Sequence, residues 1–221
     1  MPEPFISVRG EASLEAEPEI AVVWVTVMAR DPGRHRAVEL LTRRIGAVSS
    51  TIGGFGGAIE KLESQPVFVE PVFKDGRARE KILFYNARGG FAVTVSDFAV
   101  LGDLVTGLAD AGTVTVAGPD WRLRPDSPVY RAVRVAAAKD ATRRAEEYAE
   151  AFGGRVTGLV EVADTGLLAP QARHAAFATS RAMSGAGGAG EGPAFDFEPA
   201  KQTVTAQVEA RYTMTPPQFG S

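Results

Sequence analysis

Residues 5–16 read FISVRGEASLEA, and this stretch sets the pattern for the rest of the chain. From Ile6 to Leu14 apolar or small residues alternate with polar ones, and a period of two is typical of a β-strand with one buried face. After a corner at Pro18–Glu19, residues 20–28 are rich in Val and predict a longer, more buried strand. We therefore expect the chain to open with a β-hairpin.

Three later segments carry apolar residues at spacings of three and four, as amphipathic helices do. The first begins at Asp31–Pro32, where Asp suits a helix cap and Pro suits its first turn, and ends at the glycines of residues 53–57. The second begins at Ser96–Asp97 and stops at Gly112, and the third begins at Ser127–Pro128. The expected inner faces are Val38, Leu41, Ile45, Val48 and Ile52 in the first helix, Phe98, Leu101, Leu104, Val105 and Leu108 in the second, and Tyr130, Val133, Ala137, Ala141, Ala145, Tyr148 and Phe152 in the third.

The remaining patterned segments predict five further strands. Pro66 and Pro71 predict an edge position or a bulge for the first of them, because proline cannot donate to a ladder. A turn or bulge is expected at Gly118–Asp120, and a polar loop at residues 74–80. The last strand alternates so regularly that we expect it to pair centrally. The five strands are residues 58–73, 81–95, 113–124, 156–162 and 203–213.

Residues 166–199 break these patterns, since they include the run SGAGGAGEG at 184–192. Such a segment has no apolar period and too little bulk to offset its ordering entropy, which predicts a flexible insertion.

From the strands and helices together we expect one α+β domain over residues 1–221, with strand-strand-helix units at 5–112. Its second half comprises residues 113–165 and 200–215, and helices pack on one face of antiparallel sheets.

Composition limits the chemistry and the partners. The 221 residues include no Cys, which excludes disulfides, thiolate nucleophiles and thiolate metal sites. A formal net charge of −3 offers no basic excess for a phosphate backbone, so nucleic acid is not an expected partner. No segment reaches the roughly 18 apolar residues that span a bilayer, and no signal peptide is recognisable. The chain as written predicts a cytoplasmic protein, and a periplasmic or envelope-associated one if a leader precedes it.

The candidates for a metal or phosphate site are better explained as surface or turn residues. His35 lies between two arginines in a helix's first turn, and His174 lies in the insertion, neither with a second ligand three or four residues away. We therefore expect both histidines to be solvated surface residues. The glycines at 53–57 follow a helix and precede a strand, whereas phosphate-cradling loops run from a strand into a helix, so we interpret them as a cap and turn.

Three further groups of residues could serve chemistry or binding. Paired carboxylates among Glu146, Glu147 and Glu150 could serve a hydrolase, but nearby arginines favour a solvated face with pairs such as Asp140–Arg144. The third helix carries a small seam, Ala137, Ala141 and Ala145 at four-residue spacing, that lets another backbone approach closely. We interpret this seam as packing on the protein's own sheet in preference to a neighbouring subunit. Aromatic residues could line a groove, but in strands they favour the core. They are Phe68, Phe73, Phe84, Tyr85 and Trp121.

An ordered series of motifs resembles the SIMPL domain family. They are ISVRGEA at 6–12 with PEIA at 18–21, YNA at 85–87 leading to VTVSD at 93–97, the Ala-rich helix 132–151 closing on Gly153, and GLVEV at 158–162. The resemblance implies an α+β fold of antiparallel sheets backed by helices, in proteins often exported to the bacterial periplasm or envelope. It also implies large ring-like oligomers in some relatives and roles from stress protection to signalling adaptors, without an agreed active site.

The sequence therefore assigns no catalytic residue, no cofactor-binding residue and no metal ligand. We expect a non-enzymatic SIMPL-type protein that acts as an oligomeric or protein-interaction module, with itself or another protein as partner. The alternative is a small-ligand or peptide binder that uses the insertion as a lid.

Overall fold

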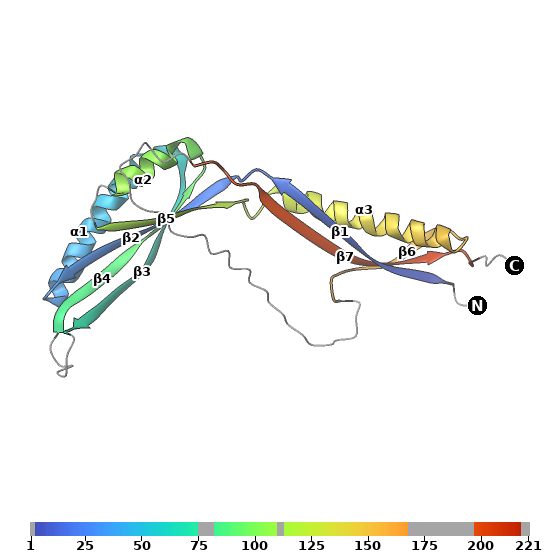
Figure 1. Ribbon diagram of the computed structural model, residues 1–221, viewed down its shortest axis with the longest axis horizontal. Helices are drawn as coiled ribbons and strands as arrows, with labels where there is room; N and C mark the ends of the chain where they lie inside the picture. Colours follow the sequence, from blue (N-terminus) through green and yellow to red (C-terminus); the bar gives the residue numbers. More distant parts are fainter. Residues whose placement is uncertain (1–2, 75–81, 110–112, 168–196, 218–221) are drawn as a thin grey trace. The chain divides into compact units, whose positions relative to one another are not determined.

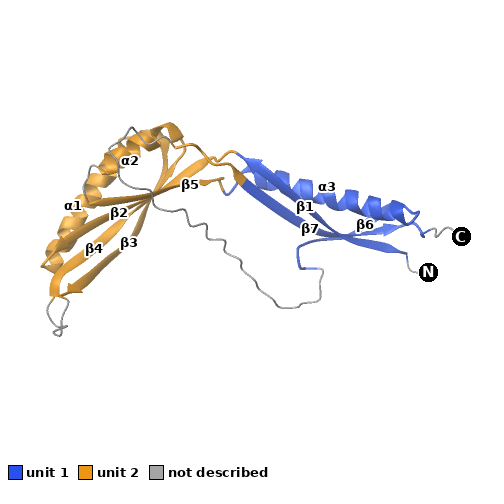
Figure 2. Cartoon of the chain, viewed as in Figure 1, with its two compact units in different colours: residues 1–16, 125–189, 203–221 blue, residues 17–124, 190–202 orange. Residues whose placement is uncertain are grey.

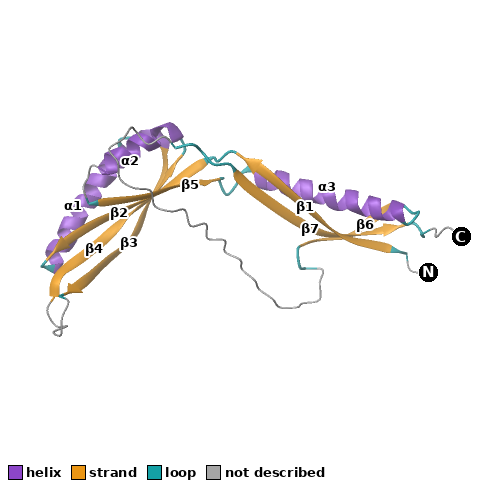
Figure 3. Cartoon of the chain, in the orientation of Figure 1, coloured by secondary structure: helices purple, strands orange, loops and turns teal. Residues whose placement is uncertain are grey.

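The computed structural model describes residues 3–74, 82–109, 113–167 and 197–217, and it divides into two compact units (Figure 1, Figure 2). Unit 1 comprises residues 1–16, 125–189 and 203–221, and unit 2 comprises residues 17–124 and 190–202. Each unit contains one β-sheet and its own helices (Figure 3). The predicted α+β class with antiparallel sheets is confirmed. The predicted loop 74–80 lies outside the described residues except for its first member, as do Gly112 and most of the insertion.

Unit 2 is a four-stranded antiparallel sheet with two helices on one face (Figure 3). Its strand order is β3-β4-β2-β5, so the proline-rich β3 is an edge strand as predicted. The core consists mainly of aliphatic side chains from β2, β4 and both helices, together with Phe91, and the partly buried Phe197 packs against it. The elements are β2 (Ile20–Asp31), α1 (Arg34–Gly53), β3 (Ile59–Phe73), β4 (Ile82–Val95), α2 (Leu101–Ala109) and β5 (Val114–Arg122), with single 3₁₀ turns at Gly56–Ala58 and Phe98–Val100.

Unit 1 is a three-stranded sheet of order β1-β7-β6 with one long helix packed mainly on β1. The last strand is central, as its alternation predicts. Helix α3 begins at Ser127, whose Oγ accepts a hydrogen bond of 3.3 Å from the Val129 backbone N–H, followed by proline in the first turn. The elements are β1 (Phe5–Ala16), α3 (Pro128–Ala151), β6 (Val156–Asp164) and β7 (Gln202–Met214).

Gly10 permits an unusually close approach of β1 to α3. A Cβ atom at this position would overlap the carbonyl oxygen of Ala137 and lie 2.5 Å from the backbone nitrogen of Ala141. Both alanines are buried against the sheet. The small seam of α3 therefore packs on its own sheet, as we preferred from the sequence.

The predicted opening hairpin is wrong, because β1 and β2 belong to different sheets. The corner between them bonds to the end of β5 instead: the Glu19 N–H donates to the Arg122 carbonyl at 2.9 Å. The Arg124 N–H in turn donates to the Glu19 carboxylate at 2.8 Å. A period of two identifies a strand and its buried face, but it does not identify the strand's partner.

Two predicted helix faces need correction. At the start of the inner face of α1 the buried residue is Ala37, whereas Val38, which was expected there, is 39% exposed. In α3 the buried stripe continues to Ala149, whereas Tyr148 and Phe152 are 48% and 51% exposed. Where a helix lies this close to a sheet, small residues fit the contact and aromatic rings do not. Helix α1 also begins two residues later than expected, after Gly33, whose N–H donates to the Asp31 carboxylate at 2.7 Å.

Candidate functional site

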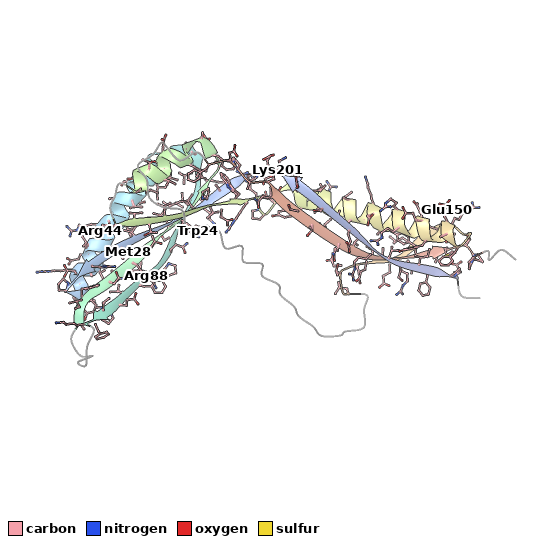
Figure 4. The ribbon with its side chains drawn as sticks, viewed as in Figure 1. Trp24, Met28, Arg44, Arg88, Glu150 and Lys201 are labelled. Atoms are coloured by element: carbon pink, nitrogen blue, oxygen red, sulfur yellow. The ribbon has the colours of Figure 1, made fainter. Side chains whose placement is uncertain are left out.

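The face of the unit 2 sheet opposite α1 and α2 is the first candidate surface. On β2, Val23, Val25 and Val27 are buried on the helix side, so the alternate residues Trp24, Thr26 and Met28 lie on the other face. The antiparallel register sets Ala92, Gly90 and Arg88 of β4 beside them in that order. Figure 4 labels Trp24, Met28 and Arg88 on this sheet. Among the described residues of unit 2, no helix covers this face.

A hollow of about 290 Å³ lies on this face around Gly90. A Cβ atom at Gly90 would overlap the carbonyl oxygen of Val25, so the β4 backbone approaches β2 here and no side chain rises from the position. The opposing strand β3 changes register between Gln65 and Phe68, which marks a bulge at the border of the hollow. The walls come from Trp24, Gln65, Pro66, Phe68 and Arg88.

Arginine side chains lie over aromatic rings on this sheet. The guanidinium carbon of Arg88 lies 4.8 Å from the Phe68 ring centroid, and that of Arg30 lies 5.4 Å from the Phe84 ring centroid. Arg122 lies 5.5 Å from the Trp24 centroid and also forms an ion pair of 2.5 Å with Asp120. Among the residues that the structure describes, no carboxylate lies within ion-pair distance of Arg88 or Arg30. Both cations are therefore held in place without being neutralised.

The edge strand β1 of unit 1 is covered by side chains of α3. The Asp140 carboxylate accepts a hydrogen bond of 3.0 Å from the Glu11 backbone N–H, and Arg144 donates one of 2.8 Å to the Arg9 carbonyl. These two contacts occupy backbone groups that a further strand would need. The Glu11 N–H, followed by the Arg143 guanidinium, lowers the pKa of Asp140 below its ordinary value of 3.8. The predicted Asp140–Arg144 pair is confirmed at 3.8 Å.

The other edge of that sheet, β6, differs sharply. Leu159, Val160 and Val162 are 58%, 55% and 58% exposed, an unusual run for a strand in a small sheet. The register with β7 shifts between Leu159 and Glu161, so Val160 is an extra residue in a bulge. No hydrogen bond among the described residues joins a side chain of α3 to the β6 backbone in the way that Asp140 joins β1.

His35 and the three glutamates of α3 considered from the sequence lie apart from these surfaces. His35 is exposed in the first turn of α1, and His174 lies outside the described residues. Glu146, Glu147 and Glu150 are exposed on α3, where Glu147 pairs with Arg143 at 2.5 Å. Across the described part of the chain, no three acidic or histidine side chains gather as metal ligands would. Other residues considered from the sequence do lie on these surfaces: Phe68 lines the hollow, Phe84 lies beside Arg30, and Asp140 and Arg144 cover β1.

The preference for a core position was wrong for three of the five aromatic residues. Phe68 and Phe73 are 50% and 48% exposed on the edge strand β3, and Phe84 lies beside the Arg30 guanidinium rather than among the described side chains packed on the core. Tyr85 and Trp121 do pack against the core. The hollow itself had a signal in the sequence, since two adjacent glycines inside a strand pattern, Gly89–Gly90, indicate a bulge or a close backbone approach.

Together these features define an α+β protein of two helix-backed antiparallel sheets whose candidate sites are surfaces rather than enclosed cavities. Residues 6–212 match the sequence model of the SIMPL family, described as "Protein of unknown function (DUF541)". Because the match covers nearly the whole chain, this protein belongs to the SIMPL family, as its resemblance implied. No curated protein matches the chain. Among the described helices, none has the length and apolar character needed to cross a membrane.

Proposed function

We propose that this protein is a non-enzymatic interaction module that assembles with a second copy of itself through the β6 edge. The observation that carries the proposal is the difference between the two edges of the unit 1 sheet. Edge strands are natural pairing surfaces, and proteins commonly block the ones that must stay unpaired. Side chains of α3 block β1, whereas β6 exposes three large aliphatic side chains.

A second copy suits this edge because of its charges. Arg155 lies immediately before β6 and Asp164 is its last residue, and both side chains are exposed. In an antiparallel pair of β6 strands, Arg155 of one copy lies beside Asp164 of the other at both ends of the contact. Among the described residues neither side chain has an ion-pair partner within its own chain.

The centre of the contact is apolar. Leu159, Val160 and Val162 of the two copies would bury one another and remove from water a surface that is otherwise unfavourable. The bulge at Val160 interrupts the ladder, so we expect the contact to depend on these side chains more than on a long series of backbone hydrogen bonds.

The test is the molar mass of the full chain in solution by light scattering on a size-exclusion column. We expect twice the 23.3 kDa of one chain, or a higher multiple, for the natural sequence. Val162→Lys places a charge in the apolar part of the contact and should give a monomer. The matched control is Val135→Lys, at an α3 position 46% exposed, which should leave the mass unchanged.

A charge exchange tests the orientation. Arg155→Glu sets a second carboxylate beside Asp164 of the other copy and should weaken the assembly, and adding Asp164→Arg should restore it. A monomer for the natural sequence at all concentrations overturns the proposal. An oligomer that Val162→Lys does not disturb places the contact elsewhere and also overturns it.

The alternative of a lid formed by residues 166–199 carries no proposal, because residues 168–196 lie outside the described part of the chain.

A further inference from the structure

We infer that the hollow around Gly90 in unit 2 binds a small aromatic carboxylate, with Arg88 holding the carboxylate and Trp24 contacting the ring. This site lies in the other unit from β6 and does not depend on the proposed assembly.

The shape of the hollow limits the size of the ligand. Its volume of about 290 Å³ is just below the range of roughly 300 to 1,000 Å³ for small-molecule pockets. The floor is the Thr26–Gly90 pair, and Gly90 contributes no side chain. A ligand of one or two rings fits such a space.

The charge of the hollow selects an anion. Arg88 is the one charged residue in its lining, and no carboxylate among the described residues lies within ion-pair distance of it. The guanidinium carbon of Arg88 lies 4.8 Å from the Phe68 ring centroid, a contact that favours this position of the cation. A guanidinium presents its N–H groups as a fork that matches the two oxygens of a carboxylate.

The rest of the lining suits a flat apolar body. Trp24, Pro66 and Phe68 supply apolar surface, and aromatic pairs with centroids roughly 4.5 to 7 Å apart gain beyond their buried area. Thr26 and Gln65 add polar groups that can fix the ligand's orientation.

The register gives the spacing between charge and ring. Trp24 lies opposite Ala92 and Arg88 lies opposite Met28, so the two side chains start four residues apart along the strands. At about 3.4 Å per residue this is roughly 14 Å between their backbone positions, and both side chains line the hollow. An arylacetate, which joins a ring to a carboxylate through one carbon, is a suitable probe of this pair.

The first experiment is calorimetric titration of the full chain at neutral pH with indole-3-acetate, and with indole-3-acetamide as the uncharged match. We expect the acid to bind at least ten-fold more tightly than the amide. Arg88→Gln should weaken binding of the acid at least ten-fold. The matched control is Arg30→Gln, because Arg30 also stacks on a ring on this sheet but does not line the hollow, and it should change the affinity less than two-fold.

Gln65→Glu is a second variant that leaves Arg88 in place. It adds a carboxylate to the lining and should compete with the ligand for Arg88, with a loss of binding similar to that of Arg88→Gln. Circular dichroism of each variant checks that the fold is retained. If Arg88→Gln does not fold, Gln65→Glu decides the question alone.

The same chemistry occurs in a free acid and in the C-terminal aromatic residue of a peptide. Titration with Gly-Gly-Trp, as free acid and as amide, separates these sources. Tighter binding of indole-3-acetate supports a small metabolite, and tighter binding of the peptide acid supports a peptide C-terminus. No binding of either acid, equal binding of acids and amides, or equal loss with Arg30→Gln overturns the inference.

Discussion

The two sheets of this protein have cores of different kinds. In unit 2 the sheet and helices are held apart by branched aliphatic side chains such as Val93, Ile52 and Leu104, each essentially inaccessible to solvent. In unit 1 the contact is made by Gly10 and by alanines of α3, with Val8 and Tyr212 beside them. The size of the residues at the contact thus sets how closely a helix approaches its sheet.

The units also differ in the surface that they leave to partners. Unit 1 has one edge covered by Asp140 and Arg144 and another that is exposed and aliphatic. Unit 2 leaves a sheet face with arginines stacked on aromatic rings and a hollow at Gly90. The exposed edge of unit 1 suits pairing of strands, and the hollow of unit 2 suits a small anionic ligand. This contrast is why the two proposals can be tested independently.

The largest effect is expected where the aliphatic core is truncated. Leu104→Ala removes a fully buried side chain of α2 and should lower the free energy of unfolding of unit 2 by about 2 to 5 kcal/mol, because a cavity remains. Both tryptophans, Trp24 and Trp121, lie in unit 2, so urea unfolding followed by their fluorescence reports on this unit. The control Leu83→Ala, at a position 53% exposed, should cost less than about 1 kcal/mol. Equal losses would show that Leu104 is not a core residue.

A somewhat smaller effect is expected where the helix of unit 1 lies closest to the sheet. Gly10→Ala adds a methyl group against backbone atoms of Ala137 and Ala141, and should destabilise unit 1 by about 1 to 3 kcal/mol. Hydrogen exchange of peptides from β1 and α3, measured by mass spectrometry, checks this because unit 1 has no tryptophan. Gly46→Ala in α1 has nothing within 4 Å and should instead stabilise by about 0.5 to 1 kcal/mol. If Gly10→Ala lowers the tryptophan transition equally, the two units unfold together and the comparison between them fails.

The smallest effect concerns the covered edge of unit 1. The pKa of Asp140 is lowered in the folded protein, so its stabilising contribution is complete above its ordinary pKa of 3.8 and is lost as the pH falls through the lowered value. Asp140→Asn should therefore remove part of the acid sensitivity of unit 1, measured by hydrogen exchange of β1 from about pH 2 to 7. Glu146→Gln on the same helix is the matched control, because this carboxylate has no ion pair among the described residues, and it should leave hydrogen exchange of β1 unchanged at about pH 7. An unchanged profile for Asp140→Asn would show that the contact with Glu11 does not stabilise the edge.

The elements that depend on nearby residues were predictable from the sequence. Ser127–Pro128 marks the start of α3, and the prolines of β3 mark an edge strand with a bulge. The register also shifts between Val22 and Trp24 opposite Gly118–Asp120, where a turn or bulge was expected. Each of these signals comes from a backbone restriction of the residue itself, so distant parts of the chain do not change it.

The candidate sites were less predictable. The pair Gly89–Gly90 could have marked the hollow. The residues near Arg88 in the sequence do not show that its guanidinium lacks an ion pair, because possible carboxylate partners lie on other strands. The exposure of Leu159, Val160 and Val162 also depends on strands far away in the sequence. An aliphatic strand predicts burial, and only the strand order shows that β6 lies at an edge beside a helix that packs mainly on β1.

By itself the sequence determined where strands and helices form, which helix has a small-residue face, and that thiol chemistry is absent. These properties follow from local periodicity, backbone restrictions and composition. The tertiary structure alone decided that β1 pairs with β7 rather than β2, which edge is covered, and where the hollow lies. The physical reason is that strand pairing and surface exposure result from competition between segments far apart in the chain, and a period of two or 3.6 carries no information about which segment wins.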